Sequence, residues 1–342
     1  MELKMRCCVC EDSHAASAPG PAGVPEPAAL IAVDGGGTKT DFVLFRESGE
    51  VLRRVTLEGC NPNTRGLPRA REILAEGVGS LLASGFPVRG LFAGIAGAST
   101  GANREALRDF LSGRLPEMKL RVEGDIYNVI GQTGEVRKCI AMICGTGSVV
   151  YGFDGESLHR AGGWGYLFDE AGSGFDIGRD ALRHCLACDE GERPEDGLSR
   201  SVREALGGPA FDRIDTLYAK GRDYIASFAP IVFGQYEKGD ETACRIIRRT
   251  ADRLAELIGR VHARCDCGGT VVAAGGLSAR KDILGPLLAS RLPPELTLVF
   301  PELPPVFGAA VQCMRLVSAE YDPAAFTRKF SQSLMRPGKE NT

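Results

Sequence analysis

Two glycine-rich turns in this chain of 342 residues have the residue types that bind phosphate groups. The first lies in "IAVDGGGTKTDFVLF" and the second in "CIAMICGTGSVVYGF", each between two apolar runs. Successive backbone N–H groups that no side chain covers form anion-binding nests, and the hydroxyls of Thr38 and Thr146 add donors. If the turns face each other, residues 35–38 and 145–148 would hold a polyphosphate from two sides.

Asp34 precedes the first turn, where a carboxylate is suited to hold Mg²⁺ through water. A turn cap is the alternative role for this acid. Each glycine turn taken alone is also typical of a plain hairpin, because glycine tolerates positive φ. A P-loop is excluded, since that motif needs GK[ST] at the start of a helix. Here Lys39 follows Thr38, and "DFVLF" continues as a strand.

The elements around the turns repeat in two halves. In the first half, a three-stranded meander precedes alternating helices and strands. We predict strands at 31–34, 41–45, 51–57, 90–97 and 120–125, and helices at 69–84 and 102–111. In the second half, the hairpin at 139–153 precedes a helical region from about residue 178, with the clearest helix at 241–264. We predict the last elements as strands within 269–278 and 296–302 and a closing helix at 306–318. Two halves that open alike predict a duplicated fold with a cleft between the copies.

The composition of the chain excludes some classes of function. The net charge of −3 gives no basic excess, so nucleic-acid binding is disfavoured. The sequence contains no run of 18 apolar residues, so we predict no membrane span. We interpret the first 28 residues as a disordered extension without a secretory signal. With 12 cysteines and no export signal, a reduced cytoplasm is the expected location.

Two groups of cysteines are weak metal or redox candidates. The N-terminal group is Cys7, Cys8, Cys10 and His14, and "CLAC" contains Cys185 and Cys188. Structural zinc sites usually have spaced ligand pairs held by folded structure, so we expect both groups to be incidental.

The motifs "VDGGGTKT", "GTGS" and "AAGGLS", in this order, resemble the phosphate-1, phosphate-2 and adenosine motifs of the actin-like ATPase and sugar-kinase superfamily. Within it, residues 29–318 resemble the N-acetylglucosamine kinase and BadF/BadG/BcrA/BcrD-type ATPase group. The resemblance implies an α/β fold with two ribonuclease-H-like domains, each a mixed five-stranded sheet with flanking helices. It also implies that ATP binds at Gly35, Gly36, Gly37, Thr38, Lys39, Gly145, Thr146, Gly147, Ser148, Gly275 and Gly276.

From this resemblance we expect the N-terminal domain, with the sugar and phosphate-1 sites, at 29–130. The C-terminal domain, with the phosphate-2 and adenosine sites, is expected at 131–310. A closing helix and a flexible tail follow at 311–342. We expect a homodimer that acts on a small-molecule amino sugar, with no nucleic-acid or membrane partner.

Asp125, in "VEGDIYNVI", matches the catalytic aspartate of these kinases, which accepts the proton of the sugar hydroxyl. A helix N-cap is its alternative role. Asn61, in "GCNPN", matches an asparagine that hydrogen-bonds sugar hydroxyls in the kinases; a plain Asn-Pro turn is the alternative.

Gly163, Trp164 and Gly165 match the "GGWG" loop of the kinases, and the only tryptophan of the chain is suited to lie against a sugar. Related kinases continue with "GDEGS", whereas this chain has "FDEAGS". Either Asp169 or Glu170 therefore takes the place of the sugar-binding aspartate. This difference from the kinase motif affects the expected identity of the substrate more than the expected phosphoryl-transfer reaction.

The resemblance implies an ATP-dependent kinase that phosphorylates the 6-hydroxyl of N-acetylglucosamine, with Mg²⁺ and ATP as cofactors. Glucosamine and N-acetylmuramic acid are alternative substrates. An ATPase that activates a radical dehydratase through an iron–sulfur cluster is a second alternative, for which Cys144 is the only ligand candidate. A sugar-sensing regulator is disfavoured, because the N-terminal segment is too short for a helix-turn-helix domain.

Overall fold

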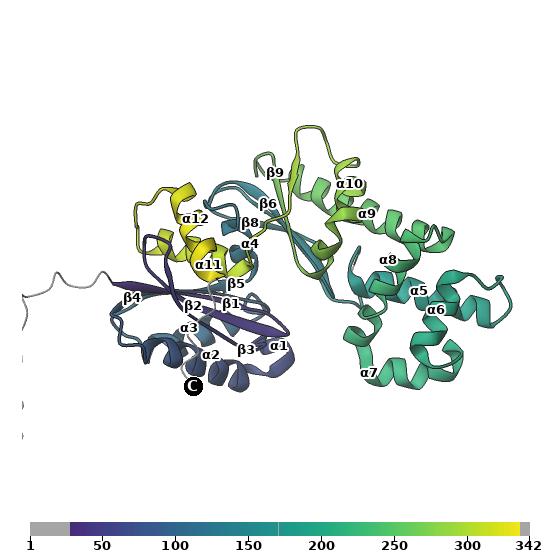
Figure 1. The fold of residues 1–342 in the computed structure, drawn as a ribbon, viewed down its shortest axis with the longest axis horizontal. Coiled ribbons are helices and arrows are strands. Elements are labelled where there is room, and N and C mark those ends of the chain that lie inside the picture. The colour runs from purple at the N-terminus through teal and green to yellow at the C-terminus, as the bar shows by residue number, and fades with distance from the viewer. Residues whose placement is uncertain (1–27, 170, 336–342) are drawn as a thin grey trace, which may run out of the picture.

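The computed structural model describes residues 28–169 and 171–335, which form two five-stranded sheets with flanking helices (Figure 1). The strand order of the first sheet is β3-β2-β1-β4-β5. Strands β1, β2 and β3 form an antiparallel meander, and β4 and β5 continue the sheet parallel to β1. The strands are β1 (Ala29–Gly35), β2 (Lys39–Phe45), β3 (Val51–Glu58), β4 (Val88–Ile95) and β5 (Lys119–Gly124).

Helices cover both faces of this sheet. In Figure 1, α2 and α3 lie below it, and α11 and α12 lie above it. Each layer has its own apolar core, one with side chains of α2 and α3 and the other with side chains of α11 and α12. The helices of this part are α1 (Pro62–Arg65), α2 (Leu67–Leu82), α3 (Asn103–Ser112), α4 (Ile126–Gly131), α11 (Pro305–Leu316) and α12 (Pro323–Leu334).

The second sheet repeats the first. Its strand order is β10-β9-β6-β7-β8. Read from the opposite edge, this is the order of the first sheet, with β6, β7, β8, β9 and β10 in the places of β1, β2, β3, β4 and β5. Strands β6 and β7 form the second glycine-turned hairpin, and β9 pairs parallel to β6. The strands are β6 (Cys139–Cys144), β7 (Ser148–Phe153), β8 (Leu158–Ala161), β9 (Thr270–Ala274) and β10 (Thr297–Val299). The expectation of two mixed five-stranded sheets is confirmed.

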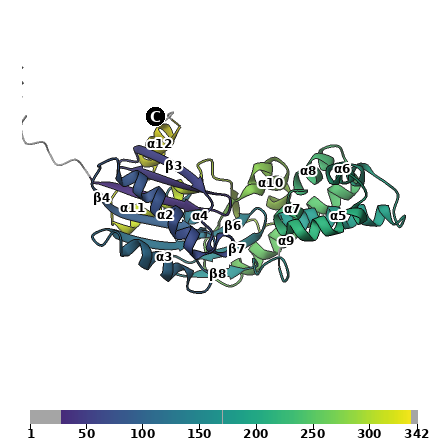
Figure 2. The ribbon, with the colours of Figure 1, turned by 90° about the horizontal axis from the view of Figure 1, so that it is seen from below.

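A helical segment between β8 and β9 has no counterpart in the first half. Its helices α5 to α8 share a separate apolar core with part of α9 and form the lobe that extends away from the sheets in Figure 2. The long amphipathic helix α9 also packs against β7 and β8. These elements are α5 (Gly174–Asp189), α6 (Gly197–Leu206), η1 (Ala210–Arg213), α7 (Ile214–Ala226), α8 (Ala229–Glu237) and α9 (Glu241–His262), followed after β9 by η2 (Gly276–Arg280) and α10 (Lys281–Ala289).

The element boundaries differ from the predicted ones where proline is present. Helix α2 begins at Leu67, with Pro68 in its first turn, where proline lacks only an N–H that has no partner in the helix. The last strand, predicted over 296–302, is limited to β10 at Thr297–Val299, and Pro301 follows it. Proline cannot donate to a sheet ladder, so the longer strand is disfavoured.

Two features bear on the expected domains. Helix α11 packs against β1 and β4 of the first sheet, although its chain follows the second sheet. Helix α12, which the sequence patterns did not predict, begins at an Asp322 cap and occupies part of the segment expected as a tail. The domain boundaries themselves stay a prediction. No helix in the described ranges is long and apolar enough to cross a membrane.

Candidate active site

Two acids lie at one edge of the first sheet. Asp34 is near the end of β1, and Asp125 directly follows β5. Strands β1, β4 and β5 are parallel neighbours, so their carboxyl ends meet at the same edge. The two carboxyls are close enough that the charge of Asp125 raises the pKa of Asp34. The structure therefore brings together the predicted base and the predicted metal ligand.

Asp125 occupies the N-cap position of α4, but its side chain makes no capping hydrogen bond. Burial raises the pKa of Asp125 to about 6, against the lowering effect of the backbone N–H groups of Asp125 and Ile126. The carboxyl also acts on the second half: burial, with a smaller contribution from the charge of Asp125, raises the pKa of Tyr151 on β7. The carboxyl thus lies between the two sheets without a structural partner of its own among the described side chains.

Asp34 has a neighbour that sequence reasoning missed. Nδ2 of buried Asn128 donates to Oδ1 of Asp34 over 2.7 Å and to the carbonyl oxygen of Gly94 over 3.1 Å. Burial raises the pKa of Asp34 to about 7, and the hydrogen bond from Asn128 lowers it. Asn128 lies one helical turn after Asp125, so the spacing Asp-x-x-Asn at a strand-to-helix junction was the signal available in the sequence.

The first glycine turn is a tight reversal. The N–H of Gly36 donates to the carbonyl oxygen of Lys39 over 2.9 Å, while Gly37 and Thr38 are exposed. Nζ of Lys39 lies 2.9 Å from Oδ2 of buried Asp41, so its ammonium is paired within the sheet. The exposed backbone and the Thr38 hydroxyl are the parts of this turn that can reach a ligand.

The second turn is exposed at Thr146, and hydrogen bonds to the rest of the protein fix the residues on either side. The hydroxyl of buried Ser148 donates to the carbonyl oxygen of Ala171 over 2.5 Å, so this hydroxyl is already used within the protein. The carbonyl oxygens of Gly145 and Thr146 accept the N–H groups of Gly174 and Phe175, which begin α5. The turn is therefore fixed by the start of a long helix.

The predicted adenosine turn lies against the second glycine turn. Gly275 has a φ of +100°, and a Cβ at this position would lie 2.4 Å from the carbonyl oxygen of Cys144. A Cβ on Gly145 would lie 3.3 Å from the backbone nitrogen of Gly276. Only glycine allows this contact, and it brings the two motifs of the second half together.

Asn61 lies beside the end of β4, since its Oδ1 would be 2.3 Å from a Cβ on Gly97. The same oxygen caps the short helix α1 by accepting the N–H of Asn63 over 2.9 Å. Within the described ranges, its Nδ2 makes no hydrogen bond. Asn61 is thus a helix cap followed directly by Pro62, whereas the alternative considered from the sequence was a plain Asn-Pro turn. Its Nδ2 remains a donor for a ligand.

The "GGWG" segment forms an exposed loop. Trp164 is 62% exposed, and the guanidinium of Arg160 lies 4.1 Å from its ring centroid. Gly163 and Gly165 have φ of +72° and +98°, which explains their identity. Oδ1 of Asp169 accepts the N–H of Ala171 over 3.4 Å. Glu170 lies outside the described residues, so the choice between the two acids stays open.

The cysteine candidates contribute nothing to this site in the described part of the chain. Cys144 is buried, and its Sγ donates to the carbonyl oxygen of Gly172 over 3.2 Å. The nine cysteines among the described residues form no disulfide. The N-terminal group with Cys7, Cys8, Cys10 and His14 lies outside the described residues.

The chain is similar to known proteins over most of its length. Residues 31–312 match the BadF/BadG/BcrA/BcrD ATPase family. The chain is 27% identical over 308 residues to the N-acetyl-D-glucosamine kinase of Dictyostelium discoideum, covering 82% of this chain and 96% of that protein. It is 29% identical over 233 residues to the N-acetylmuramic acid/N-acetylglucosamine kinase of Clostridium acetobutylicum, covering 66% and 76% respectively.

Solved structures show the same fold. A candidate N-acetylglucosamine kinase from Chromobacterium violaceum superposes with a TM-score of 0.65 at 24% identity, covering 83% of this chain and 98% of that one. A ROK family glucokinase from Streptomyces griseus, in complex with glucose and AMPPNP, superposes with a TM-score of 0.56 at 17% identity, covering 84% of this chain and 100% of that one. At these identities the likeness concerns the fold alone.

Proposed function

Since the chain belongs to the BadF/BadG/BcrA/BcrD ATPase family, we propose that it is an ATP-dependent amino-sugar kinase that phosphorylates the 6-hydroxyl of N-acetylglucosamine. The observation that carries this proposal is the Asp125 carboxyl, which lies between the two sheets without a capping hydrogen bond. The names of the two curated relatives support the substrate class.

Asp125 acts as general base. With a pKa of about 6, its carboxyl is largely ionised at neutral pH and can accept the proton of the sugar hydroxyl. The hydroxyl oxygen then forms a bond to the γ-phosphorus, and the bond from that phosphorus to the β,γ-bridging oxygen breaks, which releases ADP. The exposed backbone at Gly37 and Thr146 holds the phosphates from the two halves.

Asp34 fits the role of a Mg²⁺ ligand. Asn128 holds its Oδ1, and in the described part of the chain no hydrogen bond involves its Oδ2. A carboxyl whose pKa is raised by burial gains from a nearby cation, because the cation stabilises its ionised form. Bound Mg²⁺ would neutralise charge on the ATP phosphates.

Asn61 and Trp164 are the proposed sugar contacts, with Gly163 and Gly165 shaping the loop and Asp169 or Glu170 supplying a carboxylate. Gly275 and Gly276 are proposed to lie against adenosine. The homodimer and the cytoplasmic location belong to the same proposal.

N-acetylmuramic acid and glucosamine are the alternative substrates. The observation that favours an alternative is "FDEAGS" in place of the usual continuation of the loop, together with the dual name of the Clostridium acetobutylicum relative. The electron-transferring ATPase is not favoured, because the curated relatives are named as kinases and Cys144 is buried.

The test is a coupled assay of ADP release with Mg²⁺-ATP and a panel of N-acetylglucosamine, glucosamine, N-acetylmuramic acid, N-acetylmannosamine and glucose. We expect ADP release that depends on N-acetylglucosamine. Asp125→Asn should lower kcat by about 10²-fold or more while sugar binding persists, because only the proton acceptor is removed.

Asp109→Asn, on the exposed surface of α3, is the matched control and should leave kcat unchanged. ADP release that no sugar stimulates would contradict the kinase. Near-normal turnover of Asp125→Asn would contradict only the assignment of the base.

A further inference from the structure

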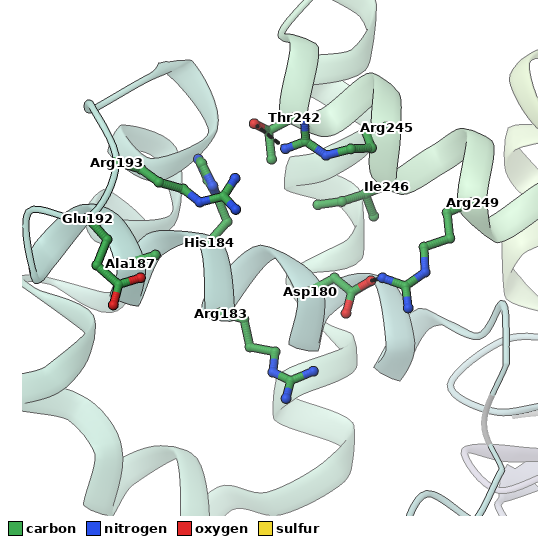
Figure 3. A pocket seen from close by; sticks show the side chains of 10 residues that line it. All are labelled: Asp180, Arg183, His184, Ala187, Glu192, Arg193, Thr242, Arg245, Ile246 and Arg249. Carbon is green, nitrogen blue, oxygen red and sulfur yellow. Dashed lines mark hydrogen bonds and ion pairs between the residues drawn. The ribbon is translucent and has the colours of Figure 1, made fainter.

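A cavity lies away from the candidate active site, between α5, α9 and the loop after α5 (Figure 3). Its volume is about 320 Å³. Helix α5 connects the two places, because its first residues donate to the second glycine turn while the cavity is near its other end. His184 lies ten residues after Gly174, or about 15 Å along the helix. The cavity is therefore separate from the expected nucleotide site.

The cavity has an excess of positive charge. Four arginines line it, against the two carboxylates of Asp180 and Glu192. Asp180 is already paired with Arg249 at 3.4 Å and with Arg179 at 3.6 Å. In Figure 3 the carboxylate of Glu192 is directed away from the two arginines whose side chains extend toward His184.

Those two arginines are Arg193 and Arg245. Among the described residues neither has a carboxylate partner, and the one hydrogen bond of Arg245 is to Oγ1 of Thr242 at 3.0 Å. In Figure 3 their guanidinium groups extend toward His184 from the loop and from α9. Guanidinium groups donate several parallel hydrogen bonds and match the oxygens of a phosphate.

His184 supplies an independent observation. The side chain is 8% exposed, and its Nδ1 is buried without a hydrogen-bond partner in the described part of the chain. Its Nε2 lies 2.7 Å from Oδ2 of Asp196, so Nε2 carries the proton of that contact. A buried, unpaired nitrogen costs free energy, and a hydrogen bond to a ligand in this cavity would remove that cost.

A metal ion is the competing explanation, since His184, Cys188 and Asp196 lie together. Their ligand atoms already have protein partners, however. Sγ of Cys188 donates to the carbonyl oxygen of Pro194 over 3.4 Å, and Oδ1 of Asp196 caps α6 by accepting the N–H of Ser199 over 2.8 Å. This cluster therefore orients the His184 ring and leaves Nδ1 for the cavity.

We propose that the cavity binds the phosphate group of a small anion, with the guanidinium groups of Arg193 and Arg245 donating to its oxygens and Nδ1 of His184 accepting the hydrogen of a P–OH group. The ligand is either free phosphate or a phosphomonoester, because both present the same oxygens to the arginines. The inference does not depend on the proposed kinase activity, since no residue of the candidate active site contributes to it.

The experiment is isothermal titration of the full chain with orthophosphate and, separately, with glycerol 3-phosphate. Mg²⁺-AMPPNP is kept saturating so that phosphate sites in the candidate active site are occupied, and ionic strength is held constant with chloride. We expect one binding event per chain for at least one probe. Arg193→Gln and Arg245→Gln should each weaken it about tenfold or more, because each removes charge-assisted hydrogen bonds.

Arg200→Gln is the matched control, because Arg200 is an exposed arginine of α6 that does not line the cavity. It should bind the probe as the unmodified chain does. All three arginines are exposed, so the variants should fold, which equal thermal unfolding would verify. Absence of binding to both probes, or equal affinity in all three variants, would overturn the proposal. A preference for one probe distinguishes free phosphate from a phosphomonoester.

Discussion

The carboxyls of Asp34 and Asp125 lie at one edge of the first sheet, where burying their ionised forms lowers the free energy of unfolding. Burial raises the pKa of Asp125 to about 6 and that of Asp34 to about 7, so each folded carboxyl resists ionisation. The charge of Asp125 also raises the pKa of Asp34. Such pairs are typical of functional sites, because a fold that only needed stability would place these acids elsewhere.

At the residue scale we predict that Asp125→Asn makes the protein more stable at pH 8. An unfolded aspartate has a pKa of about 3.9, so the raised folded pKa costs stability as pH rises through about 6. Asparagine avoids this cost. Since Asp125 is partly exposed, we expect a gain of about 1 kcal/mol, measured by urea unfolding with EDTA present.

The pH dependence separates this cause from others. The gain should shrink as pH is lowered from 8 toward 4, where the folded carboxyl of the unmodified protein is protonated and its cost disappears. A gain of equal size at both pH values would show that charge burial is not the reason. Loss of stability at pH 8 would contradict the prediction outright.

At the scale of elements, helix α4 connects the two halves. It begins at Asp125 on the first sheet, and its apolar side chains pack against β6, β7 and β9 of the second. It also packs against α11, which lies on the first sheet. The two helices meet through glycine: a Cβ on Gly308 would lie 1.7 Å from the carbonyl oxygen of Asn128. The position of the carboxyls thus depends on this crossing.

We predict that Gly308→Ala destabilises the protein by about 2 kcal/mol or more, because an added methyl group must push apart two helix backbones. The same displacement should lower kcat, since Asn128 holds Asp34. Thermal unfolding and the ADP-release assay measure the two effects.

Gly259→Ala on α9 is the control. A Cβ there meets nothing within 4 Å, so alanine should stabilise the helix by about 0.5–1 kcal/mol. If the two variants unfolded at the same temperature, the helix crossing would not be as tight as the structure shows.

At the scale of the whole molecule, the proposed ligand contacts are divided between the two sheets. Asp34, Asn61 and Asp125 belong to the first, whereas Thr146, Gly275 and the loop with Trp164 belong to the second. Neither half alone contains a complete kinase site. Sugar bound to the first half would therefore need the exposed loop of the second half to approach it.

We predict that N-acetylglucosamine protects Trp164 from acrylamide quenching. It is the only tryptophan, it is 62% exposed, and an aromatic ring lying on a sugar loses solvent contact. The Stern–Volmer slope should fall on addition of the sugar and fall further with Mg²⁺-AMPPNP. Mannitol at the same concentration is the control and should leave the slope unchanged. An unchanged slope under sugar saturation would remove Trp164 from the proposed site.

The two five-stranded sheets were implied by the family resemblance, and β8 was not among the predicted strands. The residue pattern alone predicted the two hairpins and the long helix α9. These features follow from local patterns: alternating apolar residues, glycines at reversals and 3.6-residue periodicity. The glycine turns were found for the same reason, since close backbone approach requires glycine wherever the chain is placed. Helix α12 was missed because its apolar side chains, including Phe326 and Phe330, fill a core layer that exists only after folding.

Only the tertiary structure decided which side chains meet. Asn128 on Asp34, Tyr151 near Asp125 and the arginines around His184 come together from segments far apart in the chain or from opposite faces of packed helices. It also decided the charge state of the two acids, because desolvation depends on everything packed around a carboxyl. Local sequence determines the elements, but burial and long-range contact are properties of the packed whole.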